Sequence, residues 1–168
     1  DEAYIHYSPY DNAEKIKILI ENFKNLFVLR TFSKLGLAGV RCGYGMAQEE
    51  VMEQLHRIRP PFNVNAYALA QASALLEEKK YLSYIRNENF RQLEFLSKGL
   101  AAAGLKVYPS HANFVLVKGP ENLDRVLESK KVLIRKAQSF GLSADDYRIT
   151  VGTRKENEIL LKRLKEDS

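Results

Sequence analysis

Apolar residues recur with helical spacing over much of the first hundred positions, and short apolar runs separate the helical segments. Spacings of three and four residues predict amphipathic helices at residues 13–22, 48–57, 66–78 and 81–103. Runs of consecutive apolar residues indicate strands buried on both faces, as in a parallel sheet. Such strands are expected at residues 1–7, 26–29 and 40–46, with a loop at 30–39 between the last two.

A different pattern follows Gly104, where short strand-like segments replace the long helices. We expect a short helix at residues 120–128 and strands at residues 105–108, 113–117, 132–135 and 147–151. Thr153 and Glu156 have the spacing of a capping box, in which each side chain satisfies a main-chain N–H group of the other residue. This pair predicts that the last helix begins there and runs to about residue 165.

The order of these elements predicts an α/β chain in two parts. Residues 1–60 form a β/α half-unit, residues 61–80 lead into the helical connection, and residues 81–168 form a compact α+β module. A chain of 168 residues can bury about two-thirds of its unfolded surface, which is enough for a core. The sequence begins without Met and runs directly into apolar positions, so we expect it to be a piece of a longer protein.

Composition narrows the classes of protein to which the chain can belong. With 45% hydrophobic and 28% charged residues, it has the composition of a globular protein. Its 26 Lys and Arg against 21 Asp and Glu give a net charge of +5, without the dense basic block of a nucleic-acid-binding arm. No apolar run approaches the roughly 20 residues that span a bilayer, and the first residues lack the pattern of a signal peptide. We therefore expect a cytoplasmic protein whose partners are neither nucleic acids nor membranes.

Metal binding is not expected from the residues present. Cys42 is the single cysteine, which excludes an intrachain disulfide and a Cys-rich zinc site. His6, His56 and His111 lie far apart along the chain, without the spacing of metal ligands.

The residues best suited to ligand binding or catalysis follow the apolar run at 26–29. Thr31 and Ser33 supply hydroxyl groups, Lys34 supplies an amine, and Arg41 supplies a guanidinium in the same loop. Loops at the carboxyl ends of strands bind ligands in open α/β sheets. The hydroxyl groups and the guanidinium could hold a phosphate, and the amine could form a Schiff base with a carbonyl compound. Spacing alone leaves a solvated polar loop as the alternative.

The segment from Thr31 to Tyr44 resembles the lysine loop of fold-type I aminotransferases, which depend on pyridoxal 5′-phosphate, and in particular that of the histidinol-phosphate aminotransferases. The resemblance implies that Lys34 is the catalytic lysine that binds the cofactor covalently. It also implies that Ser33, Arg41 and Thr31 hold the phosphate of the cofactor. The loop departs from the pattern of many family members, which have one more residue between this lysine and this arginine.

The first four residues, Asp1 to Tyr4, resemble the D-E-A-Y motif of the same family. The acidic side chain of that motif pairs with the pyridine nitrogen and its tyrosine contacts the phenolic oxygen, which assigns Asp1 and Tyr4 to cofactor binding. From the residues alone, Asp1 would be a frayed terminal acid and Tyr4 a core aromatic side chain. Two further segments resemble the family, namely Pro60-Pro61-Phe62-Asn63 and Ser110-His111-Ala112-Asn113-Phe114.

Two arginines near the end of the chain complete the resemblance. Arg148 begins a segment similar to the family's R-I-[ST]-V-G-T stretch, whose arginine binds the α-carboxylate of the substrate. Arg135 lies in a run similar to one whose arginine helps to bind the phosphate of histidinol phosphate. Without the resemblance, Arg148 would be half-solvated or paired with Asp145 or Asp146.

The resemblance covers essentially the whole chain but only the C-terminal half of the family pattern. It implies the end of the large cofactor-binding domain at residues 1–60, the interdomain helix region at 61–80 and the small α+β domain at 81–168. The missing half carries further cofactor contacts, including a tyrosine that reaches the partner subunit of the family's homodimer. We therefore expect the full protein to be a transaminase of histidine biosynthesis, which interconverts histidinol phosphate and 2-oxoglutarate with imidazole-acetol phosphate and glutamate. This chain alone is expected to be inactive.

Three alternatives stay open. An aromatic amino-acid aminotransferase and a threonine-phosphate decarboxylase share the fold, and a non-catalytic domain could have kept it. Substitution of Arg135 tests whether substrates that carry phosphate are favoured, and Lys34→Ala tests whether the protein is catalytic.

Overall fold

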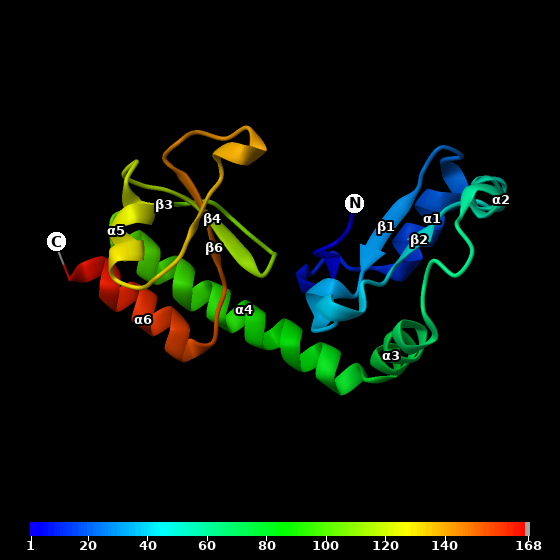
Figure 1. Ribbon diagram of the computed structural model, residues 1–168, viewed down its shortest axis with the longest axis horizontal. Coiled ribbons are helices and arrows are strands. Elements are labelled where there is room, and N and C mark those ends of the chain that lie inside the picture. The colour runs from blue at the N-terminus through cyan, green and yellow to red at the C-terminus, as the bar shows by residue number, and fades with distance from the viewer. Residues whose placement is uncertain (167–168) are drawn as a thin grey trace. The chain divides into compact units, whose positions relative to one another are not determined.

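The computed structural model describes residues 1–166, which divide into two units of contacting residues (Figure 1). The N-terminal unit comprises Asp1–Arg86, and the C-terminal unit begins at Asn87. This division falls inside one long helix, so residues 81–86 belong with the N-terminal unit. None of the helices in residues 1–166 has the length and apolar character needed to span a bilayer.

The N-terminal unit follows the expected order of elements after its first residues. The prediction of a strand at residues 1–7 was wrong. The main chain there folds back on itself, and Ile5–Tyr7 forms a 3-10 turn. The elements of the unit are α1 (Ala13–Asn22), β1 (Val28–Thr31), β2 (Gly43–Met46), α2 (Glu49–Ile58), α3 (Ala66–Glu77) and the start of α4 (Lys79–Ala102).

Strand direction in this unit also differs from the prediction. β1 and β2 pair antiparallel, with Val28 opposite Met46 and Thr31 opposite Gly43, whereas a parallel sheet was expected. A run of apolar residues shows that both faces of a strand are covered but does not encode the direction of its neighbour. The loop predicted at residues 30–39 therefore connects two adjacent strands of a hairpin.

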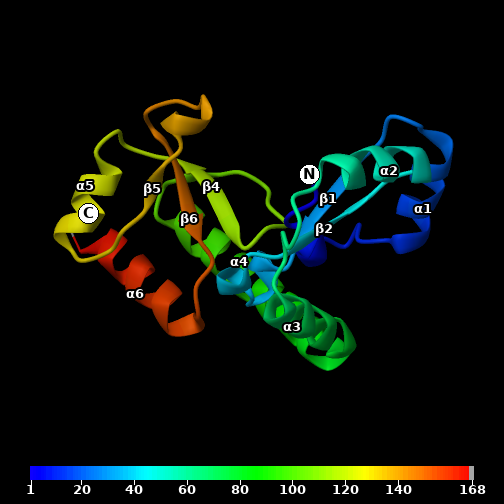
Figure 2. The ribbon, with the colours of Figure 1, turned by 45° about the vertical axis from the view of Figure 1, so that its right-hand side comes forward.

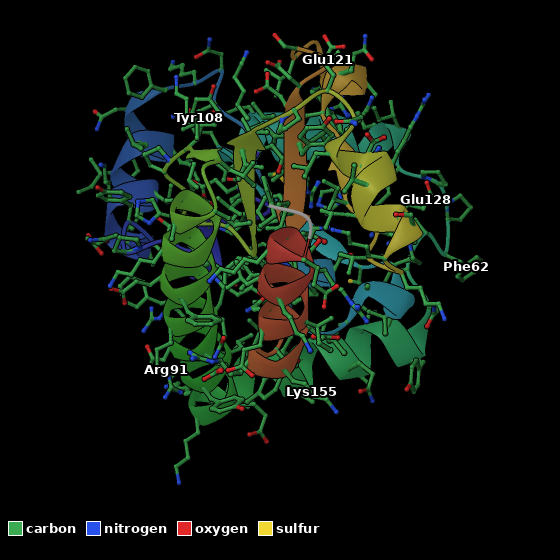
Figure 3. All side chains as sticks on the ribbon, turned by 90° about the vertical axis from the view of Figure 1, so that its left-hand side faces the viewer. Phe62, Arg91, Tyr108, Glu121, Glu128 and Lys155 are labelled. Atoms are coloured by element: carbon green, nitrogen blue, oxygen red, sulfur yellow. The ribbon has the colours of Figure 1, made fainter. Side chains whose placement is uncertain are left out.

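The core of the N-terminal unit is small. Its buried apolar residues come from the loop after β1 and from α3, and they are Phe32, Leu35, Cys42, Ala68, Ala72 and Leu75. Neither α1 nor α2 contains a buried residue. The Phe62 ring is 99% exposed and stands out from the ribbon (Figure 3).

The C-terminal unit is an antiparallel sheet packed against helices. Its elements are the rest of α4, β3 (Lys106–Val107), β4 (Phe114–Lys118), α5 (Leu123–Ser129), β5 (Arg135–Lys136), β6 (Asp146–Thr150) and α6 (Arg154–Lys165). The strand predicted at residues 132–135 starts only at Arg135. The preceding segment closes α5 instead, because Lys131 has a left-handed φ of 63° and the Val132 N–H group donates to the Leu127 carbonyl at 2.9 Å.

The order of strands in this sheet is β3-β4-β6-β5. The sheet turns one face toward α4 and α6, which lie side by side (Figures 1 and 2). Val115 and Val117 of β4 pair with Ile149 and Tyr147 of β6, and all four side chains are at most 2% exposed. Successive residues of a strand point to opposite faces, so the residues between these four lie on the face turned away from the core.

Local signals at the helix ends act as the sequence predicts. Thr153 and Glu156 form the capping box at the start of α6, which confirms that prediction. Gly104 follows α4 with a left-handed φ of 85°, a conformation that glycine adopts without steric cost.

Candidate active site

The predicted lysine loop is the connection between β1 and β2. Pairing of Thr31 with Gly43 holds the two ends of the loop together. A side chain at Gly43 would place its Cβ atom 2.6 Å from the Arg30 carbonyl oxygen, so only glycine allows this close approach of the strands. The hairpin thus fixes where the loop leaves the sheet and where it returns.

Two 3-10 turns, Ser33–Leu35 and Ala38–Val40, shape the loop. Gly36 follows the first turn with a φ of 94°, and Arg41 follows the second with a φ of 53°. A left-handed conformation is uncommon for a residue other than glycine and costs about 1–3 kcal/mol, so its surroundings must hold Arg41 in place. Left-handed residues at two points let the loop reverse direction twice within a short length of chain.

Lys34 is held through its main chain. Its carbonyl oxygen accepts a hydrogen bond from the Tyr7 hydroxyl group, which fixes the first turn of the loop. Its Nζ atom lies 5.3 Å from the centre of the Tyr4 ring. Burial, together with the neighbouring Tyr81 and Tyr4, raises the pKa of Tyr7, so this hydroxyl group keeps its proton as a donor at neutral pH. The structure therefore brings Lys34 and Tyr4, two of the predicted site residues, together.

The three predicted phosphate ligands lie in the same loop but in different settings. The Thr31 Oγ1 atom accepts from the Ser33 N–H group at 3.1 Å and donates to the Cys42 carbonyl at 3.5 Å, so this hydroxyl group supports the turn. Ser33 is half-buried. Arg41 is exposed, and one of its N–H groups donates a hydrogen bond to the Ala38 carbonyl at 3.2 Å. The other N–H groups of the guanidinium can therefore bind an anion.

Asp1 lies at an exposed turn beside β1. Its Oδ1 atom accepts from the Ala3 N–H group at 2.9 Å. The following residue, Glu2, donates its N–H group to the Leu29 carbonyl of β1 at 2.8 Å. These two hydrogen bonds give the Asp1–Tyr4 segment a defined shape on the strand that leads to the lysine loop.

The two predicted substrate-binding arginines meet in the C-terminal unit. Arg135 of β5 and Arg148 of β6 are direct cross-strand partners, so their side chains share the face of the sheet turned away from the core. The Arg148 guanidinium lies over the Phe114 ring at 4.0 Å, and that of Arg135 lies over the Phe140 ring at 4.8 Å. Like charges placed opposite each other destabilise a sheet, and a pair of guanidinium groups concentrates positive potential that attracts an anion.

Sequence reasoning missed two residues that the structure places at the loop. Arg30 is a buried cation that joins Glu2 and Asp11, and Tyr7 holds the main chain of Lys34. A charged residue directly after the apolar run at 26–29 was the available signal for Arg30, because such a charge must find a partner when buried. No pattern in the sequence indicates that Tyr7 reaches residue 34.

Other features of the described residues do not add chemistry to the site. A cavity of about 660 Å³ lies in the C-terminal unit between the segment at 131–133 and the start of α6, and its lining includes neither Arg135 nor Arg148. No group of three or more His, Cys, Asp or Glu side chains in residues 1–166 is arranged to hold a metal ion.

The sequence model of the family described as "Aminotransferase class I and II" matches residues 1–164. The curated histidinol-phosphate aminotransferase of Anaeromyxobacter sp. (strain Fw109-5) is 42% identical over 163 residues, which are 94% of this chain and 44% of that protein.

Solved structures likewise match nearly all of this chain with about half of their own length. The histidinol-phosphate aminotransferase of Sinorhizobium meliloti, in complex with pyridoxal-5′-phosphate, superposes with a TM-score of 0.86 at 30% identity and covers 99% of this chain and 47% of its own. The L-threonine-O-3-phosphate decarboxylase of Porphyromonas gingivalis superposes with a TM-score of 0.80 at 28% identity, over 98% of this chain and 52% of its own. The chain thus spans about half the length of the relatives it matches.

Proposed function

Because the chain belongs to the family of class I and II aminotransferases, we propose that it forms part of a pyridoxal 5′-phosphate-dependent transaminase acting on histidinol phosphate. The match to the family confirms the resemblance of the lysine loop to aminotransferases. The reaction interconverts histidinol phosphate and 2-oxoglutarate with imidazole-acetol phosphate and glutamate. The observation that carries the proposal is the β1–β2 connection, which places the amine of Lys34, the hydroxyl group of Ser33 and the guanidinium of Arg41 in one short loop.

The donor set of the N-terminal unit fits pyridoxal 5′-phosphate. This cofactor combines an aldehyde, a phosphate ester and a basic ring nitrogen, which require an amine, charged hydrogen-bond donors and a carboxylate, respectively. Lys34 supplies the amine, Ser33 and Arg41 supply the donors for the phosphate, and Asp1 supplies the carboxylate. Thr31 donates to the Cys42 carbonyl, so its predicted phosphate contact requires that its hydroxyl group turn away from that carbonyl.

Each residue has a distinct part in the proposed reaction. Pyridoxal 5′-phosphate, when bound, supplies an electron sink that stabilises negative charge at the α-carbon of the substrate. Lys34 Nζ would accept and return the α-proton of the substrate, which requires that the amine be neutral. The Asp1 carboxylate would pair with the protonated ring nitrogen, and the Tyr4 hydroxyl group would contact the phenolic oxygen.

The arginine pair of the C-terminal unit gives the proposal its substrate class. Arg148 would bind the α-carboxylate of glutamate with its fork, and Arg135 would bind the phosphate of histidinol phosphate. Two guanidinium groups on opposed residues repel each other, and an anionic substrate group between them offsets that repulsion. An amino acid without a second anionic group would use only one member of the pair.

The arrangement of the whole enzyme is part of the same proposal. Residues 1–60 would end the large cofactor-binding domain, residues 61–80 would form the interdomain helix region, and residues 81–168 would form the small domain. On this assignment the chain is the C-terminal half of one subunit of a cytoplasmic homodimer. It would be inactive alone, since it spans about half the length of the relatives it matches. Turnover of glutamate by the isolated chain at the rate of the full-length protein would contradict this arrangement.

A decarboxylase of threonine phosphate is the second candidate. The superposition on the Porphyromonas gingivalis decarboxylase supports it, and a phosphate-bearing substrate fits the same arginine pair. The products separate the two reactions, because a decarboxylase releases carbon dioxide and a transaminase converts 2-oxoglutarate to glutamate. An aromatic amino-acid aminotransferase, the third candidate, carries no substrate phosphate, so Arg135→Ala would leave its kcat/KM unchanged.

Covalent labelling tests the role of Lys34 directly. The full-length protein is incubated with pyridoxal 5′-phosphate, reduced with sodium borohydride and digested for mass spectrometry. We expect the reduced cofactor on the peptide that contains Lys34, since a neutral amine forms a Schiff base with the aldehyde. The matched control is Lys34→Arg, which keeps the charge and should remain unlabelled. Labelling at another lysine, or none in the unsubstituted protein, would refute the proposed function.

A further inference from the structure

Arg30 of β1 is a buried cation with two acidic partners. Its Nε and Nη2 atoms both lie 2.9 Å from Oε2 of Glu2, and Nη2 lies 3.1 Å from Oδ1 of Asp11. The other carboxylate oxygen of Asp11 contacts Nδ1 of His6 at 3.0 Å. The side chains therefore form a continuous chain of polar contacts from Glu2 through Arg30 and Asp11 to His6.

The contacts of Arg30 more than offset the cost of its burial. The side chain is 8% exposed, and removal from water opposes its positive charge. Hydrogen bonding to Tyr44 and Glu2 and the nearby charge of Asp11 outweigh that cost and raise the pKa of the guanidinium above its ordinary value. Breaking a buried pair by removing one partner leaves an uncompensated charge, which costs far more than losing a surface pair. The Glu2 carboxylate is consequently held in one place.

Glu2 is fastened to β1 at two points. Its main-chain N–H group donates to the Leu29 carbonyl at 2.8 Å, and its carboxylate accepts from the Arg30 side chain. Asp1 immediately precedes Glu2, and Thr31, at the entry to the lysine loop, immediately follows Arg30. The Glu2–Arg30 pair therefore joins the two segments to which the proposed function assigns cofactor binding.

We propose that Arg30 is a positioning residue for the cofactor, which acts through Glu2 to hold the Asp1 carboxylate in register with the lysine loop. This inference rests on the proposed function, since it assigns to Arg30 a consequence for cofactor binding. Arg30 itself touches neither substrate nor cofactor. Asp11 contacts the same guanidinium but leads away from Asp1 toward His6, so it provides a matched control for the loss of one ion pair.

The test compares Glu2→Gln with Asp11→Asn in the full-length protein. Both variants remove one carboxylate charge from Arg30 while keeping the size of the side chain. The dissociation constant of pyridoxal 5′-phosphate is measured by absorbance titration of the apoprotein, and the pH dependence of the bound cofactor's absorption is recorded. Partners that orient a metal-ligating side chain typically contribute about 10–100-fold to metal affinity or activity, and we expect an effect at the lower end of this range for the cofactor. We expect about a tenfold rise in the dissociation constant and a shifted pH midpoint for Glu2→Gln, and less than about a twofold rise with an unshifted midpoint for Asp11→Asn.

Thermal denaturation separates positioning from general support of the fold. Both variants should lower the melting temperature by similar amounts, because each weakens one pair to the same buried cation. Equal effects of the two variants on cofactor affinity and pH midpoint would overturn the proposal, as would an unchanged dissociation constant in Glu2→Gln. Arg30→Lys, which keeps the charge but not the fork, should fall between the unsubstituted protein and Glu2→Gln in cofactor affinity.

Failure of this proposal can be distinguished from failure of the proposed function. If the unsubstituted protein carries reduced cofactor on Lys34 but Glu2→Gln behaves like Asp11→Asn, only the role of Arg30 is refuted. If the unsubstituted protein neither binds the cofactor nor is labelled at Lys34, the proposed function itself is refuted.

Discussion

The two units hold their functional residues by different means. In the C-terminal unit, Arg135 and Arg148 lie on a four-stranded sheet whose other face packs on a closed core. In the N-terminal unit, Lys34 lies in a loop of a two-stranded hairpin beside a small core. There the loop packs Phe32 and Leu35 into that core, and polar contacts add further support, namely from Tyr7 to Lys34 and from Arg30 to Glu2.

Surface exposure follows the same division. Large apolar side chains are exposed on every α-helix of the N-terminal unit, for example Ile18, Ile58, Tyr67, Leu76 and Tyr81. The interior of the C-terminal unit instead contains fully buried residues from four elements, including Leu96, Leu127, Val115 and Ile149. The contrast indicates that the C-terminal unit supplies its own stability, whereas the N-terminal unit gains little from apolar burial within this chain.

The largest expected effects are on transamination, and they differ between the proposed catalytic residue of the N-terminal unit and a proposed substrate-binding residue of the C-terminal unit. Lys34→Ala in the full-length protein should lower kcat by about 10³-fold or more, because under the proposed function it removes both the general base and the covalent link to the cofactor. Arg148→Lys should lower kcat/KM for glutamate by about 10–100-fold, since an ammonium cannot make the paired hydrogen bonds of the fork. Steady-state transamination assays measure both variants.

Arg91→Lys provides the control for these assays. Arg91 is exposed on α4, where its charge pairs with Glu88, so this variant should retain normal kinetics (Figure 3). If Arg148→Lys left kcat/KM for glutamate unchanged, the division of roles between the units would be wrong.

Core substitutions should show the next largest effect and the strongest asymmetry in stability. Leu96 is 0% exposed in the C-terminal unit, and Leu96→Ala should cost about 2–5 kcal/mol in free energy of unfolding. Leu19→Ala on α1, a helix without buried residues, should cost less than about 1 kcal/mol in this chain. Hydrogen exchange reports the loss in each unit separately. Equal losses would show that the N-terminal unit also has a tightly packed interior.

Tyrosine hydroxyl groups allow a smaller, paired comparison. Tyr147 is fully buried and donates to the Pro120 carbonyl at 2.6 Å, whereas the half-buried Tyr7 donates to Lys34. Tyr147→Phe leaves a carbonyl without its partner and should cost about 1–3 kcal/mol, and Tyr7→Phe should cost less because water can replace its hydroxyl group.

The pH dependence of stability provides a second measurement on the same pair. Burial raises the pKa of both tyrosines above 10.0, so the protonated form is favoured in the folded state. The resulting stability is present in full below a pH of about 10 and is lost as the pH rises through the raised values. Urea denaturation at pH values between about 8 and about 11 measures the free energy of unfolding. The loss of this free energy at alkaline pH should be smaller in Tyr147→Phe than in the unsubstituted protein. An identical loss in both proteins would contradict the role of Tyr147.

Helix caps give the smallest contrast. Thr153→Ala removes the cap of α6, which packs into the core, and should lower the stability of the C-terminal unit by about 1 kcal/mol. Asn12→Ala removes the cap of α1, where the Asn12 side chain accepts from the Lys15 N–H group at 3.0 Å. Because α1 buries no residue, we expect local fraying of that helix without a change in the unfolding of the other unit. Circular dichroism and hydrogen exchange distinguish the two outcomes.

Prediction from sequence succeeded where the signal was local. Periodic apolar residues located four of the six α-helices in residues 1–166 to within a few positions, and the pair Thr153 and Glu156 marked the start of α6. The lysine loop and the family were recognised from consecutive residues, and the family is confirmed by comparison. Prediction failed at residues 1–7 and at the direction of β1 and β2, because an apolar run does not state what it pairs with.

The sequence by itself determined the chemical groups available at positions 1–4, 31–41, 135 and 148, because these depend only on residue type and spacing. The tertiary structure alone decided that Arg135 and Arg148 face each other across two strands, that Tyr7 holds the carbonyl of Lys34, and that Arg30 joins Glu2 to Asp11. The physical reason is that register and burial are set by contacts between segments far apart along the chain, and those contacts form only when the whole unit has folded.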